Sequence, residues 1–134
     1  MYSQNNKALL IIDIQNDYFE GGANPLIGSL KASENAKRLL EDFRRKELPI
    51  IHIQHVANRE GATFFVPNTF GVEIHQNVKP ISGESTVVKH FPNSFRETDL
   101  QTILQENNIT DLVICGMMTS MCVDATTRAA KDLG

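Results

Sequence analysis

The sequence lacks the features of several large classes of protein. Its 134 residues contain two cysteines and five prolines, and the longest unbroken apolar run spans five residues. No segment is therefore long enough to cross a membrane, and no basic stretch followed by an apolar one marks an export signal. With a formal net charge of -3 and no dense Lys/Arg cluster, the chain also lacks a positive surface for a phosphate backbone. We expect neither a membrane nor a nucleic acid as a partner.

The two cysteines are too few to form a stabilising framework. Cys115 and Cys122 are seven positions apart, which matches neither a disulfide scaffold nor a paired zinc knuckle. We therefore expect a reducing, cytoplasmic location. With 41% hydrophobic and 22% charged residues, the chain is typical of globular proteins, and its length fits one domain over residues 1–134.

Four segments rich in β-branched residues are predicted to be strands. Residues 8–14 (ALLIIDI) and 111–117 (DLVICGM) are nearly continuous apolar runs, which is typical of parallel strands covered on both faces. Residues 49–56 and 85–91 are more mixed. Because the run at 111–117 would lie near the edge of a four-stranded sheet, we expect a further strand or a partner to cover it. We predict a homo-oligomer, a dimer or larger.

Three segments show the helical spacing of apolar residues. Helices are predicted over residues 32–48, over 97–108 and from about 121 to 130. The alternation of strands and helices predicts an α/β fold with a doubly wound, mostly parallel sheet in a Rossmann-like three-layer arrangement, whose ligand crevice lies beyond the carboxyl ends of the strands. Residues 57–84 have no clear periodicity, and we interpret them as a pocket wall or a subunit contact. The residues of the first helix expected to face the core are Ala32, Ala36, Leu39, Leu40 and Phe43.

Three reactive side chains follow three of the predicted strands. Asp13, Lys89 and Cys122 would meet at one rim of a parallel sheet, although they are distant in the sequence. A thiol attacks a carbonyl as the thiolate, and a free cysteine with a pKa of about 8.5 is mostly protonated at neutral pH. The Lys89 ammonium and the start of a helix would lower the pKa of the Cys122 thiol, and Asp13 would accept its proton.

Each of these residues also has a simpler interpretation. A cysteine beside a helix is more often part of the core than catalytic, and we assign Cys115 to the core for this reason. An aspartate at a strand end often caps a turn, and a lysine is usually solvated. Because Asp13 and Lys89 both adjoin apolar strand residues, where an unpaired charge is strongly unfavourable, their coincidence favours a catalytic group.

The same residues carry a resemblance to a known family. The stretches LLIIDIQNDYF, VVKHFPNSF and LVICGMMTSMCVDATTRAA resemble, in this order, the signature blocks of the isochorismatase-like cysteine hydrolases, a superfamily that includes nicotinamidases and several small amidases. The resemblance spans almost the whole chain and implies a catalytic triad of Asp13, Lys89 and Cys122. It also implies a cis peptide bond between Met117 and Met118, and an oxyanion hole formed by the N–H groups of Met118 and Cys122.

The implied mechanism is hydrolysis of a C–N bond in a small carboxamide. Asp13 takes the thiol proton, Cys122 attacks the amide carbonyl, and the amine leaves with the proton that Asp13 returns. Water activated by the same carboxylate then hydrolyses the thioester, while Lys89 supplies charge and positioning. Two alternatives stay open: an isochorismatase-type hydrolase of an enol ether or ester-like substrate, and an inactive fragment or pseudoenzyme with only a binding or assembly role.

The sequence departs from nicotinamidases where they bind a metal ion. In place of their Asp-x-His…His cluster the chain reads HIQHVANRE, with Gln54 replacing the carboxylate. His52 and His55 are three positions apart and would point to opposite faces of a strand, so we expect no bound metal and no other cofactor. We expect His52 to be a strand residue and His55 to be a polar group of the pocket.

The substrate pocket is predicted from aromatic and polar residues near the crevice. Phe19, Gln54, Phe65 and Met117 are the candidates for substrate binding, whereas Phe95 is expected in the core. No set of residues defines the acyl group. Members of the family continue past the third helix with further strand and helix elements. We therefore expect this single domain to be C-terminally truncated and to lack part of the sheet.

Overall fold

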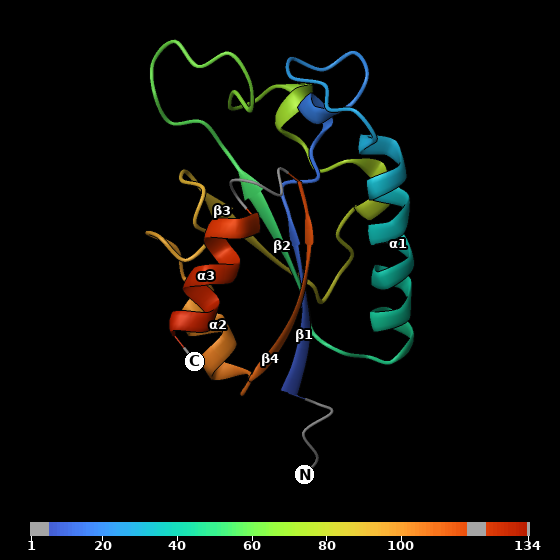
Figure 1. Cartoon of the computed structure of the whole chain (residues 1–134), viewed down its shortest axis with the longest axis vertical. Helices are drawn as coiled ribbons and strands as arrows, with labels where there is room; N and C mark the ends of the chain where they lie inside the picture. The colour runs from blue at the N-terminus through green and yellow to red at the C-terminus, as the bar shows by residue number, and fades with distance from the viewer. Residues whose placement is uncertain (1–5, 118–122, 134) are drawn as a thin grey trace.

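A computed structural model describes residues 6–117 and 123–133 of the chain. Figure 1 shows a central sheet with α1 on one face and with α2 and α3 on the other, which confirms the predicted three-layer α/β fold. The elements, with η for a 3-10 helix, are β1 (Lys7–Ile12), η2 (Asn16–Tyr18), α1 (Ser29–Arg45), β2 (Ile50–His55), η3 (Phe70–Val72), η4 (Gln76–Val78), β3 (Ser85–Lys89), α2 (Leu100–Glu106), β4 (Asp111–Gly116) and α3 (Asp124–Asp132).

The strands form a parallel sheet in the order β3-β2-β1-β4. β1 lies in its interior, and residues 8–12 are buried, as expected for a strand covered on both faces. β4 lies at the edge of the described sheet, as the sequence predicted, and residues 112–116 are only half-buried. What covers this edge stays a prediction.

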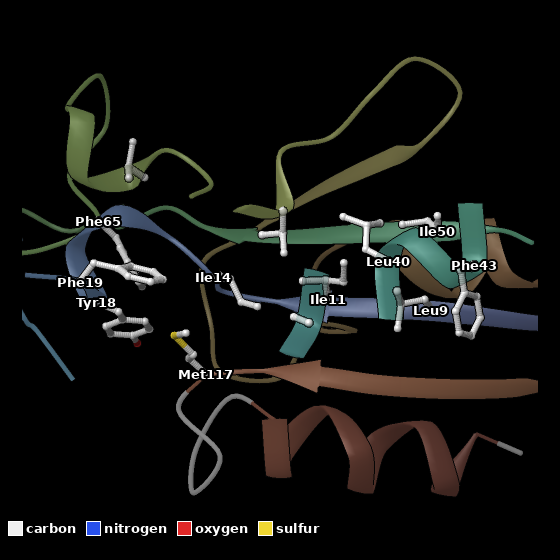
Figure 2. Packing of buried hydrophobic residues seen from close by; sticks show 13 residues of the cluster. Leu9, Ile11, Ile14, Tyr18, Phe19, Leu40, Phe43, Ile50, Phe65 and Met117 are labelled. Carbon is white, nitrogen blue, oxygen red and sulfur yellow. The ribbon is translucent and has the colours of Figure 1, made fainter. Parts of the chain in front are cut away.

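Alternate residues of β1 supply two separate hydrophobic clusters. Leu9 and Ile11 face α1 and pack with Leu40 (Figure 2). Leu10 and Ile12 face the other side and pack with residues of α2. Full burial of one such side chain contributes about 1.5–3 kcal/mol to folding. The central strand is therefore fixed from both faces, and the direction of its carboxyl end is fixed with it.

Helix α1 begins and ends three residues earlier than the sequence suggested. It starts at Ser29, after the left-handed Gly28, and ends at Arg45. Glu47 has a φ of +56°, and the N–H of Leu48 donates to Phe43 O at 3.0 Å. This closure satisfies the last carbonyl groups of the helix, and it turns the chain into β2.

The buried face of α1 differs from the predicted one at two positions. Ala32 and Leu39 are exposed, whereas Ser33 is fully buried. The Ser33 hydroxyl donates to Leu30 O at 2.7 Å and accepts from Asn77 Nδ2 at 3.0 Å. A serine can occupy this core position because both hydrogen-bonding functions of its hydroxyl have partners.

Helix α2 and the four strands are shorter than predicted. Residues with positive φ flank α2, Glu97 at +53° and Asn108 at +55°, and they confine the helix to Leu100–Glu106. β1 and β3 end at residues 12 and 89 rather than at 14 and 91. The predicted start of the third helix, near residue 121, lies outside the described residues. No helix in the described parts of the chain is both long and apolar enough to span a membrane.

Gly116 lets β4 end against the backbone of β1. Its φ is +149°, and a Cβ atom at this position would lie 2.1 Å from Ile12 O. The same oxygen accepts a hydrogen bond of 3.0 Å from the N–H of Met117. The two strands therefore approach too closely here for any side chain at position 116.

Substitution of this glycine tests the close approach. Gly116→Ala is expected to lower the free energy of unfolding by about 2–5 kcal/mol, because the added methyl group must displace the Ile12 carbonyl and the backbone must keep a strained φ. Urea unfolding followed by circular dichroism measures the loss. Gly83→Ala is the matched control: φ is +92°, but nothing lies within 4 Å of the added Cβ. Equal losses in the two variants would contradict the role of the contact.

Candidate active site

Asp13 and Lys89 meet beyond the carboxyl end of β2. Asp13 directly follows β1, has a φ of +57° and donates its N–H to Ile53 O at 3.0 Å. Lys89 is the last residue of β3. Because β2 lies between these strands, the two side chains reach towards each other across its end, and Asp13 Oδ2 lies 3.2 Å from Lys89 Nζ. The structure thus brings together two of the predicted site residues.

This ion pair is fully buried. Both side chains are 0% exposed, and Lys89 Nζ also donates to Pro92 O at 2.9 Å. Charges removed from water need close partners of opposite sign and hydrogen bonds, and this arrangement provides both. Chemically, it combines a carboxylate that can accept a proton with a fixed positive charge that can stabilise a nearby anion.

The remaining members of the predicted triad and oxyanion hole lie outside the described residues. These are Cys122, Met118 and the peptide bond between Met117 and Met118. The chain enters this segment beside the pair, because the Met117 N–H donates to the carbonyl of Ile12, the residue before Asp13. The triad, the oxyanion hole and the cis peptide bond stay predictions.

His55 lies on the wall of a small cavity close to the ion pair. Burial lowers the pKa of His55 to about 4, and the positive charges of Lys89 and His90 contribute to the shift. The cavity has a volume of about 100 Å³, and its wall also includes Phe65. At neutral pH the imidazole of His55 is therefore an uncharged hydrogen-bonding group facing the cavity.

The other predicted substrate-binding residues do not share this cavity. Phe19 and Gln54 line a different one of about 580 Å³, in which Phe19 stacks on His75 with ring centroids 3.9 Å apart. Gln54 Nε2 donates to Val72 O at 2.9 Å. Met117 is 4% exposed and packs in the α1-side core (Figure 2). The four candidates thus lie in three places: Phe65 at the small cavity, Phe19 and Gln54 at the larger one, and Met117 in the core.

His52 and His55 do not face a common site. His52 is 1% exposed, and its Nε2 lies 2.7 Å from Glu84 Oε1, while Glu84 pairs with Arg44 of α1 at 2.6 Å. Burial lowers the pKa of His52, against the opposing effect of Glu84. Within residues 6–117 and 123–133, no three His, Cys, Asp or Glu side chains form a group that could hold a metal ion. The expectation of no bound metal stays a prediction.

Gln15, which the sequence did not indicate as a site residue, joins three segments of the chain. Its side chain is fully buried, and Nε2 donates to His55 O at 2.8 Å and to Val72 O at 2.7 Å. Oε1 accepts from the N–H of His55 at 2.8 Å. Gln15 therefore ties the end of β2 and the 57–84 segment to the chain that leaves β1.

Asp17 was missed as well, and it fixes the wall of the cavity. Its Oδ2 accepts from the N–H of Phe65 at 2.6 Å, and its Oδ1 accepts from the N–H of Ala23 at 3.0 Å. Phe65 has a φ of +55°, which is uncommon for a bulky residue. A signal was present in the sequence, because Asp13, Gln15 and Asp17 follow an apolar strand at alternate positions.

Comparison with known proteins finds a family match over nearly the whole chain. The isochorismatase domain model matches residues 7–134. The uncharacterized isochorismatase family protein YddQ of Bacillus subtilis is 52% identical, over 95% of this chain and 71% of that protein. The crystal structure of a protein described as a "putative isochorismatase hydrolase" from Oleispira antarctica has a TM-score of 0.95 at 48% identity, and the match covers 100% of this chain and 72% of that one.

Two more distant relatives carry names that state an activity. A streptothricin hydrolase of Streptomyces noursei is 33% identical over 96% of this chain and 45% of its own length. The crystal structure of N-carbamoylsarcosine amidase from Thermoplasma acidophilum has a TM-score of 0.87 at 25% identity, with 93% of this chain and 75% of that chain covered. Both names describe hydrolytic or amide-cleaving enzymes.

A double-mutant cycle tests the energetic coupling of the buried pair. Asp13→Asn and Lys89→Met are each expected to lower the free energy of unfolding by about 3 kcal/mol or more, because each leaves one buried charge without its ionic partner. The double variant should lose less than the sum of the single variants, with a coupling energy of about 1–3 kcal/mol in chemical denaturation.

The control cycle uses an exposed pair of similar geometry. Arg128 Nε lies 3.0 Å from Asp124 Oδ2, with side chains 78% and 50% exposed. Asp124→Asn and Arg128→Met should be additive, because solvent screens the interaction. Additive losses in the buried cycle as well would contradict the coupling of Asp13 and Lys89.

The low pKa of His55 predicts sensitivity to acid. Below an ordinary histidine pKa of about 6.5, the unfolded chain binds a proton at this position, while the folded protein does not until about pH 4. The free energy of unfolding should therefore decrease as the pH falls from about 6.5 to about 4. His55→Asn should reduce the slope of this decrease in urea titrations at several pH values, and an unchanged slope would contradict the buried, neutral state of His55.

Proposed function

The chain belongs to the isochorismatase family of hydrolases, and on this premise we propose that it cleaves a C–N bond of a small carboxamide through a thioester intermediate. The observation that carries the proposal is the buried Asp13–Lys89 pair, with 3.2 Å between the charged atoms. A proton acceptor and a fixed positive charge at one site are what a thiol nucleophile needs for activation.

In the proposed reaction, the Cys122 thiol gives its proton to Asp13, and the sulfur forms a bond to the amide carbonyl carbon. The C–N bond then breaks, and the leaving nitrogen takes the proton back from Asp13. Water gives a proton to the same carboxylate and attacks the thioester, which releases the acid and restores the thiol. The Lys89 ammonium stabilises the thiolate and the negative charge that develops.

The relatives support amide cleavage as the type of reaction. One is named as a streptothricin hydrolase and another as an amidase of N-carbamoylsarcosine. The presence of Cys122 favours the same chemistry over cleavage of an enol ether, because a thiol nucleophile serves acyl transfer. We propose that neither a metal nor another cofactor takes part.

The small cavity supports a compact substrate. Its volume of about 100 Å³ corresponds to roughly three molecules of liquid water. Its wall contains His55, uncharged at neutral pH, together with His90 and Phe65. We propose that this cavity receives the polar part of a small carboxamide, with Phe65 as an apolar boundary.

Turnover of a panel of small amides tests the proposal. Released ammonia or amine is measured for the parent and for Cys122→Ala and Asp13→Asn, each of which is expected to lower kcat/KM at least about a hundredfold because proton transfer or the nucleophile is lost. Mass spectrometry of the rapidly quenched reaction should detect an acyl group on the peptide that contains Cys122.

Cys115→Ala is the matched control, because burial raises the pKa of the Cys115 thiol to about 12 and keeps it from acting as a nucleophile. This variant should keep the turnover of the parent, as should parent protein dialysed against EDTA. Full turnover by Cys122→Ala would exclude thiol chemistry and favour the enol ether or ester-like alternative. A folded parent that is inert across the panel would favour a binding or assembly role.

A further inference from the structure

Two buried hydroxyl groups join α3 to the loop that follows β3. Thr126 lies in the first turn of α3, Ser94 lies in the loop, and both are 0% exposed. The Thr126 hydroxyl accepts from the N–H of Ser94 at 2.9 Å and donates to Ser94 Oγ at 2.7 Å. Because water does not compete at buried positions, these bonds hold the helix and the loop at a fixed spacing.

The same cluster reaches the ion pair through one carbonyl group. Pro92 O accepts from Lys89 Nζ at 2.9 Å and lies 3.4 Å from Thr126 Oγ1. Lys89 Nζ in turn lies 3.2 Å from Asp13 Oδ2. A continuous series of polar contacts therefore runs from the first turn of α3 to the centre of the candidate active site.

Within residues 124–132, helix α3 buries few side chains of its own. Figure 1 places it on the same face of the sheet as α2. Of its residues Asp124–Asp132, only Thr126 is buried. The neighbouring hydroxyl of Thr127 is exposed and donates to Val123 O, within the same helical turn, at 2.7 Å. Val123, which directly precedes the helix, is half-buried and packs against the cluster of Leu10 and Ile12. The bonds of Thr126 add a fully buried polar anchor in the first turn.

We propose that Thr126 and Ser94 are positioning residues. They fix the start of α3 relative to Lys89, and thereby the position of the Cys122 thiol, which precedes Thr126 by four residues. The inference rests on the proposed function, in which Cys122 is the nucleophile. A thiol that moves away from the Lys89 ammonium loses part of the stabilisation of its thiolate. Loss of the Thr126 hydroxyl should therefore raise the pKa of the Cys122 thiol.

The rate at which iodoacetamide alkylates Cys122 tests this inference without any substrate. The rate is measured at a series of pH values, and peptide mass spectrometry separates Cys122 from Cys115. Thr126→Val exchanges the hydroxyl for a methyl group of similar size. At a pH at least one unit below the parental inflection, alkylation of Cys122 should become about tenfold slower, as expected for a thiol pKa about one unit higher. Thr126→Ser keeps the hydroxyl and should keep the parental profile. Cys115, a half-buried thiol whose pKa is raised to about 12, is the internal reference for an unreactive thiol.

Thr127→Val is the matched control, because it removes the adjacent, exposed hydroxyl from the same helix. It should leave the pH dependence of Cys122 alkylation unchanged. Circular dichroism confirms that each variant is folded. A folded Thr126→Val protein with the parental profile would overturn the inference, and so would a Thr126→Ser protein as slow as Thr126→Val. If Thr126→Val does not fold, Ser94→Ala decides: it keeps the backbone bond to Thr126 but removes Oγ, and a parental profile would overturn the inference.

The outcomes separate this inference from the proposed function. In one outcome the parent shows no amide turnover, but its rate of Cys122 alkylation has an inflection below about pH 8.5 that rises in Thr126→Val. This outcome would overturn the proposed substrate but support the positioning role. Amide turnover that depends on Cys122, combined with a profile that Thr126→Val does not alter, would overturn the positioning role alone. A parent without amide turnover, whose inflection lies near about 8.5 and is moved by no variant, would overturn both.

Discussion

The buried pair of Asp13 and Lys89 constrains the carboxyl end of the whole sheet. Neither charge is stable there alone, because removal from water is strongly unfavourable unless the partner lies close. β1 must therefore end before Asp13, whose positive φ turns the chain away, and β3 must end at Lys89. The loop after β3 must also return, so that Pro92 O accepts from the ammonium. The positions of three chain segments follow from this one interaction.

The loops around the pair are held by polar side chains as well as by hydrophobic packing, in which Phe65, Val72 and Val78 take part. Irregular backbone near a buried site leaves N–H and C=O groups that need partners. Gln15, Asp17 and Thr126 supply them to β2, to the 57–84 segment and to the loop after β3. Such bonds are directional, so they fix loops at defined distances while leaving room for a cavity such as that beside His55.

The sequence predicted those features that depend on local patterns. The apolar runs located all four strands and the edge position of β4, and the strand-end rule placed Asp13 and Lys89 together. The helical pattern predicted the buried Ala36, Leu40 and Phe43 of α1. It did not predict Ser33, which is buried, whereas Ala32 and Leu39 are exposed. Apolar spacing favoured alanine and leucine there, but the partner of Ser33 is Asn77, which is 44 positions away. No local pattern encodes such a contact.

The difference between local patterns and long-range contacts also separates the chemistry of the site from its substrate specificity. Asp13 and Lys89 are placed by strands, and they were predictable from their flanking sequence. The surroundings of Phe19, Gln54 and Phe65 depend instead on the path of residues 57–84, which is fixed by bonds between residues 48 and 57 positions apart, from Asp17 and Gln15. Changes within 57–84 can therefore reshape the cavity without altering the ion pair. In a scaffold of this kind, the reaction type is encoded at the strand ends, and the choice of substrate is encoded in long-range contacts between loops.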